Sequence, residues 1–322
     1  LSVSDNPEIL TPEAVQGDNS TLWMSPEISF KDTSYHRVFG WHVSQLGYNS
    51  KIGIVIENTG TTDLEIRNAK GFYRSSPNSW VHYDVGLPVA EAIISGFTNK
   101  TLPFNITIPA GEKMLLQEFQ LNNGSLVGFI NDFDIVNTNS HSNGQYQVRV
   151  AFSNDSNKDL TTISGAPVKL DKKNPHPRGT WLASEIAATT PTYEVGSPEI
   201  AYSISNGQTD NLYTLDSALK TESQILANPG HFGASYKITI PIVNNNSADQ
   251  KIRIRLSARG GVYTGAIRTP DGVFLVPVLT AGTEVANLYD YAAAPGTSEI
   301  QLELMHAGGA SLAVAIDILT LE

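Results

Sequence analysis

The chain has 322 residues, no cysteine and a formal charge of −11, from 21 Lys and Arg against 32 Asp and Glu. This balance excludes the basic surface that nucleic acids and anionic membranes attract, and no apolar run reaches the ~18 residues of a membrane-spanning helix. The missing cysteines exclude disulfides, iron–sulfur centres and thiol catalysis. With 40% hydrophobic residues, the chain is long enough to bury the cores of two domains.

The first 27 residues are polar, contain Pro7 and Pro12, and show no sustained periodicity. We therefore expect an extended N-terminal arm over 1–27. The chain begins with Leu1 rather than Met, which indicates a removed signal peptide, with a trimmed chain as the alternative. Low charge, acidity and the absence of cysteine favour an exported protein.

Residues 28–165 are predicted to form a first β-sandwich, because the dominant hydrophobic period is two. The strands are expected at 51–57, 64–67, 104–108 and 145–152. The first two, joined by a turn at Asn58, resemble a hairpin. One short helix interrupts this pattern near 88–95, because Pro88 suits a first helical turn and Gly96 suits the position after the last turn.

Residues 166–180 are predicted to be a linker, since charged residues and prolines there continue neither regular element. A second β-sandwich, jelly-roll or Ig-like as the first, is expected over 181–322. Its strands are predicted at 235–243, 251–256, 273–279, 299–305 and 311–321. Glycine turn signals separate these runs, which is typical of sandwich folds.

The two halves echo each other. Residues 54–73 contain a strand, Asn58 and a second strand, and residues 240–263 repeat this order around Asn244. A duplication explains the repeat, and so does the pattern of strand, asparagine, strand and turn that any two sandwiches share.

Three glycine-rich segments, at 230–236, 258–265 and 306–311, follow the pattern GxxGxxY, GGxxxG and AGGxS. In these motifs the chain resembles exported Firmicute surface proteins of the kind associated with copper-amine-oxidase-like N-terminal repeats. The amine-oxidase-like repeat itself is not evident in this chain. The resemblance implies an exported, surface- or matrix-associated β-protein, and it implies neither an oxidase activity nor catalytic residues.

Enzyme motifs are missing from the sequence: there is no G-x-S-x-G, H-E-x-x-H, Walker A or G-x-G-x-x-G pattern. His36 and His42 would share one face of a strand and could ligate zinc or copper, but two ligands are too few without a carboxylate. Glycine pairs at 260–261 and 308–309 could cradle an anion, although turns or bulges explain them as well.

Asp155, Asn157 and Asp159 have the D-x-N-x-D spacing that begins calcium loops, where alternate oxygens converge on one cation. The sixth position is Leu160 rather than Gly, so the pattern fails as an EF-hand. The sequence leaves open a calcium site of another kind at these residues, or a solvated acidic loop. No other cofactor is expected.

Tryptophans and Tyr83 offer a second candidate site, because exposed aromatic rings stack on sugars. Trp80 and Tyr83 form the most suggestive cluster, and Trp23, Trp41 and Trp181 could add to it. The alternative is that these rings lie in the cores.

These observations together predict a non-enzymatic extracellular structural protein, a subunit of a cell-surface layer, filament or matrix. Assembly with copies of itself would use β-sheet edges and the N-terminal arm. The alternative is a carbohydrate-binding or adhesion module of a secreted protein, with a cell-wall or extracellular glycan as its partner. A hydrolase with an unrecognised site is the third hypothesis.

Overall fold

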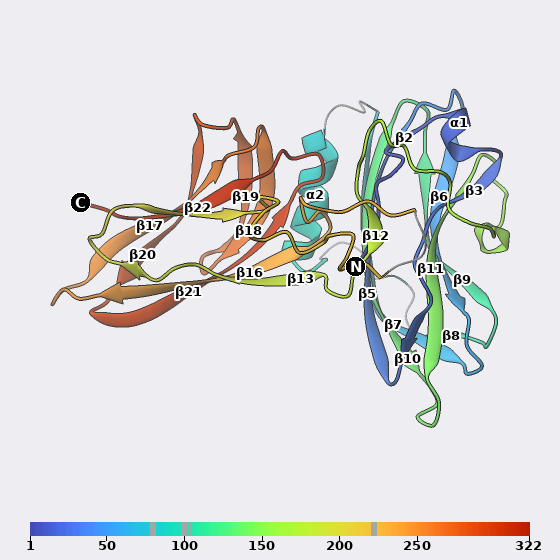
Figure 1. The fold of residues 1–322 in the computed structure, drawn as a ribbon, viewed down its shortest axis with the longest axis horizontal. Helices are drawn as coiled ribbons and strands as arrows, with labels where there is room; N and C mark the ends of the chain where they lie inside the picture. The colour runs from blue at the N-terminus through green and yellow to red at the C-terminus, as the bar shows by residue number, and fades with distance from the viewer. Residues whose placement is uncertain (78–81, 98–101, 103–104, 220–223) are drawn as a thin grey trace. The chain divides into compact units, whose positions relative to one another are not determined.

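The computed structural model describes residues 1–77, 82–97, 102, 105–219 and 224–322. The described chain forms two compact units, and the strands of each unit form two sheets (Figure 1). The fold is therefore all-β and of the sandwich kind, as predicted. Unit 1 comprises Leu1–Val81, Phe97–Leu182 and Tyr213–Asn228, and unit 2 comprises His82–Gly96, Ala183–Leu212 and Pro229–Glu322.

Sheet A of unit 1 runs in the order β12-β1-β5-β10-β7-β8, with β2 also paired to β5. Its strands are β1 (Ser2–Ser4), β2 (Ile9–Leu10), β5 (Thr33–Ser44), β7 (Leu64–Ser76), β8 (Ile106–Ile108), β10 (Leu126–Asn137) and β12 (Arg178–Thr180). Sheet B runs in the order β3-β11-β6-β9, with β4 also paired to β11. Its strands are β3 (Asn19–Met24), β4 (Ile28–Phe30), β6 (Ser50–Asn58), β9 (Lys113–Leu121) and β11 (Gly144–Ser153).

Sheet C of unit 2 runs in the order β13-β16-β21-β18-β19, with β14 also paired to β16. Its strands are β13 (Glu185–Thr189), β14 (Tyr193–Glu194), β16 (Ser235–Asn244), β18 (Tyr263–Thr269), β19 (Gly272–Leu279) and β21 (Gly296–His306). Sheet D runs in the order β15-β22-β17-β20. Its strands are β15 (Ile200–Ile204), β17 (Gln250–Ala258), β20 (Val285–Ala293) and β22 (Val314–Thr320).

The helical elements are short. The single-turn helix α1 (Pro12–Val15) begins after Thr11, whose hydroxyl accepts a hydrogen bond from the Ala14 N–H. The predicted helix is present as α2 (His82–Ile94), which starts six residues before the predicted position, so Pro88 lies inside it. A 3₁₀ turn, η1 (Leu160–Thr162), follows β11. Among the described residues no helix is long and apolar enough to cross a bilayer.

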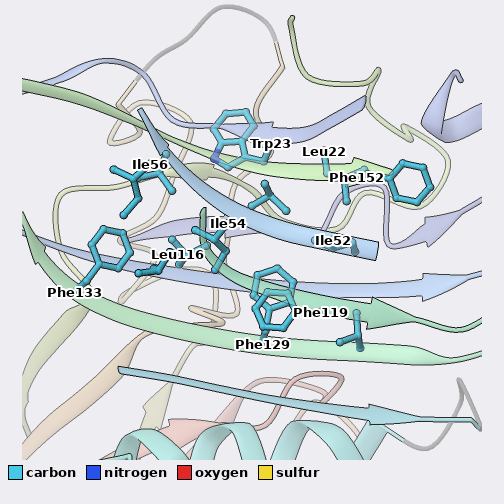
Figure 2. Packing of buried hydrophobic residues seen from close by; sticks show 14 of the residues in the cluster. Leu22, Trp23, Ile52, Ile54, Ile56, Leu116, Phe119, Phe129, Phe133 and Phe152 are labelled. Atoms are coloured by element: carbon cyan, nitrogen blue, oxygen red, sulfur yellow. The ribbon is translucent and has the colours of Figure 1, made fainter. Parts of the chain in front are cut away.

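The core of unit 1 lies between sheets A and B, and Figure 2 shows its side chains meeting from both sides. Phe119 of β9 stacks on Phe129 of β10 with ring centroids 4.4 Å apart. Gly40 of β5 makes this packing feasible, because a Cβ there would lie 2.0 Å from the Phe129 ring. Aromatic pairs in such offset contact stabilise the core beyond their buried area.

The core of unit 2 follows the predicted alternation. Ile238, Ile240 and Ile242 of β16 are buried, as are Ile252, Ile254 and Leu256 of β17. Between the β17 positions, Lys251, Arg253 and Arg255 point outward and are exposed or half-buried. This period of two places one face of each strand in the core.

The two units share a framework of strands. The order β5-β10-β7-β8 in sheet A matches β15-β22-β17-β20 in sheet D, and the pair β6-β9 in sheet B matches β16-β21 in sheet C. The prediction of a hairpin from 51–57 and 64–67 is wrong, because β6 and β7 lie in different sheets. The connection crosses between the sheets instead of reversing within one, and β16 and β17 do the same.

Two asparagines fix this crossing in the same way in both units. The Asn58 side-chain amide donates to Thr62 O and Ile108 O, at 2.8 and 2.9 Å, and its Oδ1 accepts from the Gly60 N–H. Asn244 donates to Ala248 O and Ala293 O, at 3.0 and 2.8 Å, and accepts from the Asn246 N–H. The repeat seen in the sequence therefore corresponds to an equivalent turn in each unit, which begins with a buried asparagine.

The first residues of the chain are not the extended arm that the sequence predicted over 1–27. Strand β1 lies inside sheet A, parallel to β5 and antiparallel to β12, and Val3 is fully buried. Strand β3 pairs with β11 in sheet B. The strand Ser2–Ser4 is too short to show a period, and its partners, near 38 and 180, are distant in sequence.

The predicted linker and domain boundaries also differ from the structure. Residues 166–180 pack within unit 1, where β12 pairs with β1 and Arg178 is fully buried. Unit 1 also takes Tyr213–Asn228 from beyond the predicted boundary, and unit 2 takes His82–Gly96 from before it. Long-range contacts decide membership of a unit, and composition along the chain does not record them.

Candidate functional site

The predicted calcium residues lie in the loop between β11 and η1. Asp155 Oδ1 accepts the Asn157 N–H at 2.8 Å, and Asp159 Oδ1 accepts the Thr161 N–H at 3.0 Å. The Thr161 side chain and N–H also lower the pKa of Asp159. One oxygen of each carboxylate thus stabilises a turn of its own loop, which accounts for the spacing in the sequence. Calcium binding there stays a prediction.

The predicted aromatic platform is divided by the fold. Trp80 lies outside the described residues, and Tyr83 is partly buried in the first turn of α2. Trp23, Trp41 and Trp181 are at most 2% exposed, so they belong to the interior of unit 1. These three rings cannot stack on a ligand from solvent.

The two strand histidines share a face of β5, as predicted, and they are buried. His36 Nε2 lies 3.0 Å from Ser2 Oγ, and its Nδ1 lies 3.1 Å from the Tyr146 hydroxyl. His42 contacts Ser4 Oγ at 3.1 Å and Pro7 O at 3.0 Å. Burial lowers the pKa of both rings, that of His42 to about 4. Hydroxyl and carbonyl partners, rather than a metal ion, therefore explain this histidine pair.

Unit 2 contains a similar relay of a tyrosine, a histidine and a serine. The Tyr263 hydroxyl lies 3.0 Å from His306 Nδ1, and His306 Nε2 lies 2.9 Å from Ser205 Oγ. Ser205 Oγ also contacts the Tyr236 hydroxyl at 3.0 Å. Tyr236 in turn hydrogen-bonds His231 and donates to Asp210 at 3.3 Å. Burial lowers the pKa of His306 to about 3 and that of His231 to about 4.

This network brings together a serine, two histidines and an aspartate, the residue types that serine hydrolases use. Ser205 has φ 53°, an uncommon backbone conformation for a side chain other than glycine. However, Ser205 is only 4% exposed, and the Asp210 carboxylate accepts the backbone N–H groups of Ser205 and Asn206. Hydrolysis by a serine requires a solvent-accessible nucleophile beside its substrate. The network as it stands fixes the loop 205–210 against sheet C.

The glycine pairs permit close backbone contacts. A Cβ on Gly260 would lie 1.8 Å from Leu312 O, and a Cβ on Gly86 of α2 would lie 2.3 Å from Gly308 O. The Gly260 N–H donates to Ala313 O at 2.9 Å. These glycines therefore allow two backbone segments to lie close together, which agrees with the prediction of turns or bulges at these positions.

The exposed apolar side chains gather at one sheet edge. Strand β19 ends sheet C and pairs within that sheet with β18. Among the described residues, ten large apolar side chains are exposed, and three of them, Val273, Leu275 and Val278, lie on β19. Two more lie at the ends of strands that neighbour β19 in the sequence, Val262 directly before β18 and Val285 at the start of β20. We call Gly272–Leu279 with these neighbours the β19 edge.

The β19 edge carries no charged residue, and its backbone is open on one side. Unpaired N–H and C=O groups of an edge strand are a template for pairing with another strand. Pro277 has no N–H to offer, so pairing is restricted to the first part of the strand, 272–276. The geometry fits association with an extended strand, without a cofactor.

Sequence reasoning missed one group of metal-ligand type. Asp5, Glu8 and His176 place one ligand atom each within 4.8 Å of one another. The sequence separates His176 from the carboxylates by about half the chain, and its proline-flanked position was interpreted as linker. The pairing of β1 with β12 brings them together.

Comparisons with known proteins supply no family. No family model matches the chain, and no curated protein does. Among solved structures, the chain is similar to a Paenibacillus xanthan lyase (8% identity, 92% of this chain and 25% of that chain, TM-score 0.20). It is also similar to Lac15 from a marine microbial metagenome (9% identity, 85% and 50%, TM-score 0.14). The chain spans a quarter to a half of these structures, and at such TM-scores the likenesses carry no argument.

Proposed function

We propose that this protein is an extracellular structural protein, a subunit of a cell-surface layer, filament or matrix, whose copies associate through the β19 edge. The observation that carries the proposal is the concentration of exposed apolar side chains on one uncharged edge strand. Edges of soluble monomers usually carry charges or are covered, so an edge of this composition indicates an interface.

The occupant that we propose is the β19 edge of a second copy, in antiparallel pairing around a twofold axis. Such a contact is self-complementary: the same strand supplies the backbone groups and the apolar side chains on both sides. The uncharged edge also avoids the repulsion that two copies with a charge of −11 would feel elsewhere on their surfaces. A layer or filament needs a further contact beyond this dimer.

Two other features support a structural role. The serine and histidines of the relays are buried in hydrogen-bonded networks, so they serve the interior. The acidic, cysteine-free composition suits an extracellular protein built without disulfides. The predicted arm is left out of the proposal, because residues 2–4 are an interior strand of sheet A.

The test is sedimentation of the full chain over a range of concentrations, together with negative-stain images. We expect concentration-dependent association that Leu275→Lys abolishes, because a lysine on an edge strand disfavours pairing. The matched control is Leu215→Lys, since Leu215 is 48% exposed and belongs to unit 1 rather than to the β19 edge. Monomers at high concentration would overturn the proposal. Dimers alone would keep the β19 contact and exclude the layer or filament.

A groove on sheet C favours the second candidate, a carbohydrate-binding module. Lys237, Arg268, Gln301 and Glu303 line a cavity of about 310 Å³. Arg268 pairs with Glu303 at 3.2 Å, and Lys237 pairs with Glu185 at 2.9 Å. These polar groups can hydrogen-bond sugar hydroxyls. Glycan binding that is lost in Gln301→Ala would favour this candidate, and an array without binding would exclude it.

A further inference from the structure

We infer that Asp5, Glu8 and His176 form a binding site for a divalent transition-metal cation, of which Zn²⁺ is the best match. Asp5 follows β1, Glu8 precedes β2 and His176 precedes β12. His176 Nε2 lies 2.8 Å from a Glu8 carboxylate oxygen, and Nδ1 lies 3.8 Å from Asp5 Oδ2. The inference is independent of the proposed function.

A buried carboxylate oxygen without a hydrogen-bond partner is available as a ligand of a cation. Asp5 is 5% exposed, and among the described residues its Oδ1 has no hydrogen-bond partner. A buried carboxylate is costly unless it is paired or coordinates a metal ion. The buried carboxylate of Asp5, next to Glu8 and His176, therefore favours a cation bound between these three side chains.

The backbone around the site is held in place before any ion binds. The Asp5 N–H donates to Pro177 O at 3.2 Å, which joins the two segments directly. The Asn6 side chain donates to Asp171 O and Asn174 O, at 3.0 and 3.1 Å. Trp41 Nε1 donates to Glu8 Oε1 at 3.2 Å, which leaves the other oxygen toward His176. Such supporting contacts orient metal ligands.

The donor set selects the kind of metal. One imidazole nitrogen with two carboxylate oxygens suits zinc and its neighbours, whereas calcium takes six to eight oxygens. Ligand atoms ~2 Å from a zinc ion lie ~3 Å apart, so a small movement closes the present group around an ion. His176 can make that movement, because its side chain is 38% exposed.

Binding at this site would join the loop after β1 to the segment before β12. Both strands belong to sheet A, and they pair with each other. A ligand that binds the folded state and not the unfolded one stabilises the fold in proportion to its affinity and concentration. We therefore expect the cation to act as a structural clamp of unit 1.

The experiment is calorimetric titration of the EDTA-treated full chain with Zn²⁺, paired with thermal unfolding. We expect one equivalent bound and a higher unfolding temperature. Asp5→Asn and His176→Ala should each weaken binding at least tenfold. Asp5→Asn keeps the shape of the side chain and removes its charge. The control is His141→Ala, because His141 is an exposed loop histidine of unit 1.

Three results would overturn the inference. The first is wild-type protein that binds no Zn²⁺. The second is equal binding by His176→Ala and wild type, or equal loss in His141→Ala, which would place the ion at other histidines. The third is Ca²⁺ binding as tight as that of Zn²⁺, which would contradict coordination by an imidazole. Circular dichroism at 20 °C establishes that each variant is folded.

Discussion

Units 1 and 2 are built on the same framework of strands and differ at their open edges. In unit 1, β9 ends sheet B and carries Lys113 and Glu118, which pair with Glu57 and Lys51 at 3.3 and 3.0 Å. In unit 2, β19 ends sheet C without a charged residue and exposes Val273 and Leu275. The first edge has the protection that monomers use, and the second lacks it.

The two units therefore share the strands of their framework, and the strands added to that framework give each unit its own kind of edge. The β18–β19 hairpin is inserted between β17 and β20, whose counterparts β7 and β8 enclose the segment with α2 instead. Both interiors also contain a tyrosine hydroxyl, a buried histidine and a serine in line, but these residues lie on or next to strands that are not counterparts in the two units. The two relays are therefore also additions to the shared framework.

The largest loss of stability is expected on replacing a buried arginine of unit 1, and it is compared with the loss on replacing an exposed arginine of unit 2. Arg178 is a fully buried cation of unit 1 that donates to the carbonyl oxygens of Asn6, Leu22, Val168 and Gln224. Arg178→Met should lower the free energy of unfolding by ~4 kcal/mol, because these acceptors lose their donors inside the protein.

The matched change in unit 2 is Arg253→Met. Its pair with Asp290 is exposed to solvent, so we expect a much smaller loss than for Arg178→Met. Urea unfolding, with hydrogen exchange to assign the destabilised unit, measures both variants. Equal losses would contradict the contrast between the two arginines.

The next effect tests whether the frameworks are equivalent. Asn58→Ala and Asn244→Ala each remove the side-chain donors of two carbonyl oxygens at the crossing between sheets, one of them in a buried hydrogen bond. We expect a loss of ~3 kcal/mol in each case, located in unit 1 for the first and in unit 2 for the second. The same urea experiment measures it. A large loss in one unit and none in the other would break the equivalence.

A smaller effect comes from pH and concerns the relay of unit 2. His231 and His306 stay neutral when folded, with pKa values of about 4 and about 3, because burial disfavours their charged forms. In the unfolded chain they protonate near pH 6.5. Their contribution to the free energy of unfolding is therefore fully present above pH 6.5. It is lost as pH falls toward 4, by ~2 kcal/mol per histidine at pH 5.

The variant His231→Gln should remove one histidine's share of that slope and leave the rest. Tyr236 and Asp210 face the same ring, and Asp210 acts in the opposite direction by favouring the charged imidazole. Urea titrations at pH 7 and pH 5 measure the slope. An unchanged slope in His231→Gln would show that this ring does not control the acid sensitivity of unit 2.

Much of the fold could be predicted from local patterns. The alternation over 251–256 predicted which face of β17 is buried, and Asn58 and Asn244 indicated the turn that both units share. Strand β1 could not be found in this way, because three residues, Ser2–Ser4, carry no period and their partners lie far along the chain. The predicted start of helix α2 lies too late in the chain. Proline is typical of a first helical turn, whereas this helix continues through Pro88.

The site residues, too, could be predicted only where they depend on a local pattern. The loop of Asp155 and Asp159 is local, so its turn could be seen in the spacing, although capping and metal binding leave the same pattern. Asp5, Glu8 and His176 meet only because β1 pairs with β12, which no local pattern records. The β19 edge was visible as a strand, but its place at the end of a sheet depends on the topology.

Association of two copies through the β19 edge of unit 2 can be detected by amide hydrogen exchange, recorded at low and at high protein concentration. We expect the amides of 272–276 to become more protected as the concentration rises, while those of β9 do not change. Protection that is independent of concentration in β19, or that rises in β9 instead, would contradict it.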